Sequence, residues 1–159
     1  MQPDATALNG ALTAEIAALR AFVALLREEQ QSLVHGALDH LTSFTEPKAK
    51  WMLELTRLAE VRLGLLRAGN LPADRSGMER LVREHATNAP QALALWQQVL
   101  LLTADAHHLN DLNGTLIATR LRGTQQALSA LFSAARIPGA YAADGSTVPF
   151  HTAHKLAVA

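Results

Sequence analysis

The sequence predicts an all-α protein, an elongated antiparallel helical bundle or coiled coil of three long helices with short helical pieces and a flexible C-terminal tail. Two observations predict this class. Alanine and leucine supply 58 of the 159 residues, and both are strong helix formers. Along most of the chain the apolar residues recur three or four positions apart, which places them on one stripe of an α-helix.

The first long helix is predicted over residues 5–34. Apolar residues from Leu8 to Leu33 keep the three-four spacing, and Gly36 is a residue type that commonly follows a helix end. A short apolar piece, residues 37–44, follows before the next helix begins.

The second long helix is predicted to begin at Thr45, which can cap it, with Pro47 in the first turn, where its missing N–H costs nothing. It ends near Gly69. A loop follows over residues 70–77, and charge pairs four residues apart predict a short helix over residues 78–86.

The third long helix is predicted from Pro90 to about Ala135. Between Pro90 and Arg120 the charged residues are Asp105 and Asp111, so this helix has no wide charged face. This helix must therefore lie at the centre of the fold or cover another apolar surface.

One dipeptide complicates this third helix. Asn113-Gly114 is typical of turns, which would break the helix at Gly114. The apolar positions nevertheless stay in register on both sides of it, which favours one continuous helix.

The chain divides by composition into a helical bundle, residues 1–136, and a tail, residues 137–159. Prolines and glycines interrupt the tail, and its apolar residues, including Tyr141 and Phe150, have no clear period. Two interpretations stay open, a frayed terminus or a segment that orders on a partner.

Composition and charge exclude several classes of function. The formal net charge is zero and the pI is near 7.1, so binding to nucleic acid is not expected. Without cysteine there is no disulfide and no thiolate metal site. The first residues lack a signal sequence and the aliphatic runs are too short to span a membrane. We expect a cytoplasmic protein with no membrane insertion.

Nothing in the sequence predicts catalysis or a cofactor. A carboxylate-bridged metal site needs several Glu-x-x-His pairs, and the nearest match on a predicted helix is Asp105 with His108. Adjacent His107 and His108 point in different directions on a helix. There is no glycine-rich phosphate loop and no nucleophile elbow. We expect no metal, no cofactor and no enzymatic activity.

Several short stretches, taken together, resemble a known family. Asn110 to Ile117 has the form Asn-x-x-Asn-Gly-x-Leu-Ile, and Tyr141 to Gly145 has the form Tyr-x-x-x-Gly. Acidic residues also end a leucine-rich first helix. The chain resembles the FlgN-type flagellar export chaperones over roughly residues 8–155. The residues of the first stretch that carry the resemblance are Asn110, Asn113, Gly114, Leu116 and Ile117.

The resemblance implies a cytoplasmic chaperone without a cofactor. It would hold the hook-filament junction proteins FlgK and FlgL before export and then dock at the export gate protein FlhA. It assigns Tyr141 and Gly145 to gate docking. A helix with few charges can pack its apolar stripe against an amphipathic client. The candidate client contacts are Leu121, Leu128, Leu131, Val148 and Phe150.

Other interpretations stay open beside this one. Asn110 and Asn113 could be buried residues that fix the register of helix packing, and Gly114 could allow another helix to approach closely. Lys48, Lys50 and Arg62, which match basic positions of the family, are expected on solvated faces. The alternative function is a coiled-coil adaptor or structural bundle with no export client.

Overall fold

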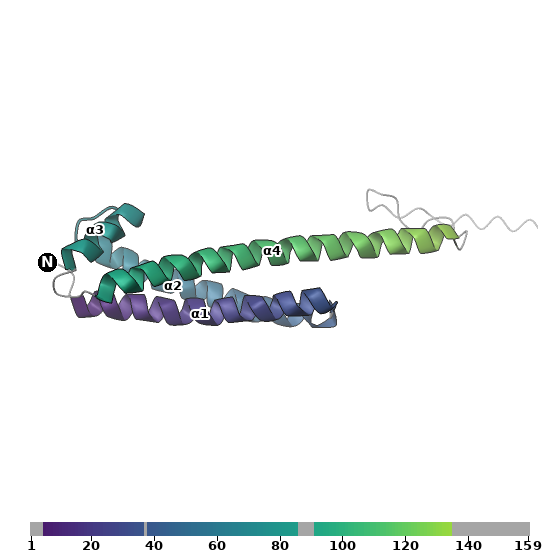
Figure 1. The fold of residues 1–159 in the computed structure, drawn as a ribbon, viewed down its shortest axis with the longest axis horizontal. Helices are drawn as coiled ribbons and strands as arrows, with labels where there is room; N and C mark the ends of the chain where they lie inside the picture. The colour runs from purple at the N-terminus through teal and green to yellow at the C-terminus, as the bar shows by residue number, and fades with distance from the viewer. Residues whose placement is uncertain (1–4, 37, 86–90, 135–159) are drawn as a thin grey trace, which may run out of the picture. The chain divides into compact units, whose positions relative to one another are not determined.

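The computed structural model describes residues 5–36, 38–85 and 91–134, and every regular element within these ranges is a helix (Figure 1). The predicted all-α class with three long helices is confirmed. In chain order the elements are α1 (Ala5–His35), the 3-10 helix η1 (Leu38–Phe44), α2 (Thr45–Ala68), α3 (Arg75–His85) and α4 (Gln91–Ala134).

The end of α1 lies where the sequence predicts it. Gly36 adopts a positive φ of 76°, a conformation that glycine reaches without steric cost. Its N–H donates to the Leu33 carbonyl at 3.3 Å. The chain then winds into η1, which occupies the short apolar piece between the first two long helices.

The predicted cap of α2 is wrong. Phe44, and not Thr45, occupies the N-cap position, and no side chain caps the helix there. The reason is that η1 leads directly into α2, since Phe44 already has helical backbone angles of −84° and −18°. The far end is as predicted, because α2 stops at Ala68 and Asn70 follows with a φ of 52°.

Helix α3 begins at Arg75, earlier than the predicted residue 78. The Asp74 carboxylate starts it by accepting hydrogen bonds from the Gly77 N–H at 2.9 Å and the Ser76 hydroxyl at 2.7 Å. These bonds, the Gly77 bond foremost, lower the pKa of Asp74. Glycine is required at 77 because a Cβ there would lie 1.9 Å from the Pro72 carbonyl oxygen.

Helix α4 is continuous through Gly114 and ends within a residue of the predicted position. Apart from the backbone of α4 itself, no described atom lies within 4 Å of where a Gly114 Cβ would be. Gly114 therefore does not serve the close approach of another described helix, which corrects one of the interpretations above.

The long helices alternate in direction through the bundle. Glu29 of α1 pairs with Lys48 of α2, and Glu15 pairs with Arg62. Residue numbers thus rise along α1 as they fall along α2, so the two helices are antiparallel, as Figure 1 also shows. The first turns of α4 pack beside the first half of α1.

The described residues divide into two units between Leu116 and Ile117, so the boundary lies within α4. The core of the first unit joins α1, the end of α2, α3 and the start of α4. Of the predicted core residues, Leu12, Ile16, Leu19, Leu26, Leu58 and Val99 are buried, and Leu55, Leu102, Leu109 and Leu116 are half-buried.

Helix α1 is long and apolar enough by composition to cross a membrane. The core helix of a soluble protein passes the same test. Here the apolar stripe of α1, from Leu8 to Leu33, is buried within the first unit, which is compatible with a soluble core helix.

We predict that Leu26→Ala lowers the free energy of unfolding by about 2–5 kcal/mol, because Leu26 is fully buried and its truncation leaves a cavity. Leu53→Ala is the matched control, since Leu53 is 73% exposed on α2, and should cost less than about 0.5 kcal/mol. Urea unfolding followed by circular dichroism measures both, and equal losses would contradict this burial pattern.

Candidate functional site

Two polar clusters connect the three long helices inside the first unit. In the first cluster, Arg62 of α2 donates to the Glu15 carboxylate of α1 from Nε at 2.9 Å and from Nη2 at 3.3 Å. The same guanidinium lies 5.3 Å from the centroid of the Trp96 ring of α4, within the range of a cation–π interaction. Glu15 and Trp96 are buried, so one residue from each helix meets in the interior.

The second cluster repeats this arrangement. Lys48 of α2 donates to both carboxylate oxygens of Glu29, at 3.1 and 2.9 Å. Asn113 of α4 donates from Nδ2 to a Glu29 oxygen and to the Leu26 carbonyl, each at 2.8 Å. Asn113 is fully buried and Glu29 is 4% exposed.

The two clusters have matched spacing. Glu29 follows Glu15 by two heptads along α1, and Arg62 follows Lys48 by two heptads along α2. A slip of either helix would separate both carboxylates from their cations and leave buried charges unpaired, which is costly. The clusters therefore fix the register of α1 against α2, and Asn113 fixes α4 against both.

The residues of the Asn-x-x-Asn-Gly-x-Leu-Ile stretch separate into two groups by burial. Asn113 lies in the interior and packs the helices, whereas Asn110 and Gly114 are exposed on α4. Leu116 is half-buried and Ile117 is 38% exposed.

The expectation that Lys48 and Arg62 lie on solvated faces is wrong. Their side chains are only 21% and 19% exposed, and each pairs with a carboxylate of α1. Lys50, by contrast, is exposed. A sequence signal did exist, because Glu15 and Glu29 interrupt the apolar stripe of α1 at equivalent positions and require cationic partners.

The described part of the second unit, residues 117–134, carries an uncovered apolar surface. None of these residues is buried, and Phe132 alone among them is half-buried. Four large apolar residues recur at helical spacing on one face, and we call them the α4 stripe. They are Ile117, Leu121, Leu128 and Leu131, with exposures of 38, 58, 48 and 63%.

The opposite face of this segment is polar. Arg122, Gln126, Ser129 and Ser133 lie on it and are exposed, about half a helical turn from the stripe. The segment is thus amphipathic, with an apolar face that no described residue buries. Contiguous exposed apolar surface of this kind marks interaction sites in soluble proteins.

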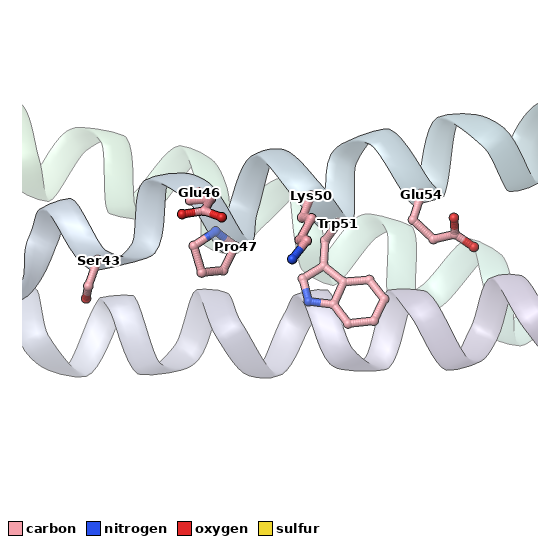
Figure 2. Close-up of a pocket in the computed structure, with 6 residues that line it drawn as sticks. All are labelled: Ser43, Glu46, Pro47, Lys50, Trp51 and Glu54. Carbon is pink, nitrogen blue, oxygen red and sulfur yellow. The ribbon is translucent and has the colours of Figure 1, made fainter.

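A separate pocket of about 630 Å³ lies along η1 and the first half of α2. Figure 2 shows the Trp51 ring and the Pro47 ring beside carboxylate and ammonium groups. Arg57 donates two hydrogen bonds to Glu54, at 2.9 and 2.7 Å, and thereby lowers the pKa of that carboxyl. The lining residues are Ser43, Glu46, Pro47, Lys50, Trp51 and Glu54.

The residues that line this pocket include no histidine and no cysteine. Among the residues that the structure describes, no three His, Cys, Asp or Glu side chains are placed to hold one metal ion.

The residues assigned to gate docking, Tyr141 and Gly145, lie outside the described residues, as do the candidate client contacts Val148 and Phe150. The remaining candidate contacts, Leu121, Leu128 and Leu131, all belong to the α4 stripe.

Comparison with known proteins decides the family. The model of the FlgN protein family matches residues 1–149. The chain belongs to the FlgN family. The FlgN family is a family of chaperones of flagellar type III secretion and not a family of enzymes.

A solved structure supports the same conclusion. The crystal structure of a flagella synthesis protein FlgN from Pseudomonas aeruginosa is similar to this FlgN-family chain, with a TM-score of 0.63 and 25% sequence identity. The match covers 77% of this chain and 94% of the other. No curated protein sequence matches the chain.

We predict that Lys48→Met destabilises the bundle by about 2–3 kcal/mol, because it leaves the buried Glu29 carboxylate without its cation. Lys50→Met, two residues away and exposed, should change stability by less than about 0.5 kcal/mol. Combining Glu29→Met with Lys48→Met should cost less than the two single changes added together. Urea unfolding measures all four variants, and equal effects of Lys48→Met and Lys50→Met would contradict the role of this cluster.

Proposed function

We propose that this FlgN-family chain is a cytoplasmic flagellar export chaperone that binds the C-terminal regions of the junction proteins FlgK and FlgL and delivers them to the export gate protein FlhA. The observation that carries the proposal is the α4 stripe, a row of large apolar residues on an amphipathic helix. An amphipathic client segment can pack along such a row as one helix along another.

The expected free energy of client binding suits reversible binding. Burial of a leucine side chain contributes about 1.5–3 kcal/mol, and the ordering of a client segment offsets part of that gain. A row of four such residues therefore supports moderate affinity. Binding of this kind needs neither a nucleotide nor a metal.

The parts of the chain then have separate roles. The bundle within residues 1–136 holds α4 in register through Glu15, Glu29 and their partners. The tail, residues 137–159, supplies Tyr141 and Gly145 to the gate and adds Val148 and Phe150 to the client surface. A coiled-coil adaptor with no client is the alternative that the following experiment excludes or supports.

We predict that Leu121→Ser combined with Leu128→Ser weakens binding of the FlgK C-terminal segment at least tenfold, about 1.4 kcal/mol. Both residues are exposed, so the melting temperature should hardly change. Isothermal titration calorimetry with the purified segment from the same organism measures the affinity.

The matched control is Leu101→Ser, because Leu101 is 69% exposed on the same helix but belongs to the first unit. It should bind the client as the unmodified chain does. Equal binding by both variants would remove the α4 stripe from the client surface, and no binding by the unmodified chain would favour the adaptor.

We predict that Tyr141→Ala weakens binding to the cytoplasmic domain of FlhA roughly thirtyfold, about 2 kcal/mol, because tyrosine is a frequent hot-spot residue. The free energy of unfolding should stay within about 0.5 kcal/mol, and client affinity should change much less. Calorimetry with both partners separates the outcomes. An equal loss for both would assign Tyr141 to the client surface, and a loss of stability would assign it to the core.

A further inference from the structure

A glycine lies in the middle of the segment that carries the α4 stripe. Gly123 is exposed within α4, and no atom lies within 4 Å of where its Cβ would be. Packing among the residues that the structure describes therefore does not require glycine at this position. Glycine is nonetheless a poor residue for a helix interior, since it lowers the helix equilibrium roughly fivefold relative to alanine.

The place of Gly123 around the helix excludes a simple role in client packing. Each residue advances about 100° around the axis, so Gly123 lies roughly 120° from the middle of the α4 stripe. A client seated on Leu121 and Leu128 would not meet this position. The missing side chain affects the helix itself more than the surface that the helix presents.

Packing against the other described residues contributes little to holding the segment helical. None of residues 117–134 is buried. Two side-chain hydrogen bonds of the segment go to carbonyls of the same helix, from Arg122 to Ala118 and from Thr124 to Arg120. Because most helical stability in proteins comes from tertiary packing, the helix content of this segment depends strongly on the propensity of each residue.

Two glycines elsewhere provide a contrast. Gly10 in α1 and Gly64 in α2 are also exposed, with no atom within 4 Å of a Cβ. Their helices are held by buried leucines such as Leu12 and Leu66. Glycine at these places lowers the stability of the bundle but has no effect on the helicity of residues 117–134.

We propose that Gly123 is a helix-weakening residue that keeps the client-binding segment close to balance between helix and coil. The inference rests on the proposed function, because it concerns the same α4 stripe. Only the helical form presents the four stripe residues on one face, so apparent affinity is reduced by the fraction of molecules in that form. The glycine therefore limits client affinity, because it lowers the fraction of free molecules that can bind.

The test compares Gly123→Ala with Ala130→Gly, in the full-length chain. Ala130 is exposed and also lies away from the stripe, so the two changes alter helix propensity in opposite directions without altering the contact surface. Gly64→Ala is the matched control. Amide hydrogen exchange of residues 117–134 is measured without client, and affinity and the rates of association and dissociation are measured with the FlgK C-terminal segment.

Gly123→Ala should slow exchange in the segment and tighten client binding by up to about twofold, mainly through faster association. Ala130→Gly should do the reverse. Gly64→Ala should raise the stability of the bundle and leave exchange of the segment and client affinity unchanged.

Three outcomes contradict parts of this account separately. Weaker client binding by Gly123→Ala would mean that the glycine makes room for the client, and would overturn the inference. Unchanged exchange and affinity, with loss of binding by the Leu121 and Leu128 variant, would overturn the inference and leave the proposed function standing. Altered exchange without client binding by the unmodified chain would overturn the proposed function.

Discussion

The bundle depends on two buried carboxylates. Glu15 and Glu29 lie within the apolar stripe of α1, and each is held by a cation of α2. An unpaired charge in such a place costs several kcal/mol, so only a register that satisfies both is stable. Leucine packing alone would tolerate a slip of one heptad, because it repeats. The polar clusters remove that freedom, and with Asn113 they also position α4.

The register that the two polar clusters fix also decides which part of α4 belongs to the core. Asn113 is the last buried residue of this helix, and the exposed stripe begins four residues later at Ile117. The first part of α4 thus contributes to the core, and the described residues of the second part stay exposed apart from the half-buried Phe132.

Local signals predicted the fold well and the polar clusters badly. Helix ends at Gly36 and Ala68 follow from nearby residues and their periodicity, so they could be predicted. Thr45 was misassigned because the cap depends on how η1 enters the helix. Arg62 contacts a residue 47 positions away, and periodicity places such a residue outward unless the partner is known. Burial of Asn113 to fix the helix register was one of the interpretations of the sequence and agrees with the structure, whereas Asn110 is exposed.

The Asn113-Gly114 pair shows how tertiary contacts override turn chemistry. Asparagine favours turns because its side chain can bond to nearby backbone groups. Here the Asn113 amide donates instead to the Leu26 carbonyl and the Glu29 carboxylate of another helix, and these contacts hold its side chain in the interior. Gly114 then continues the helix at a cost in propensity. The dipeptide that looks like a break is therefore a place where α4 is bonded directly to α1.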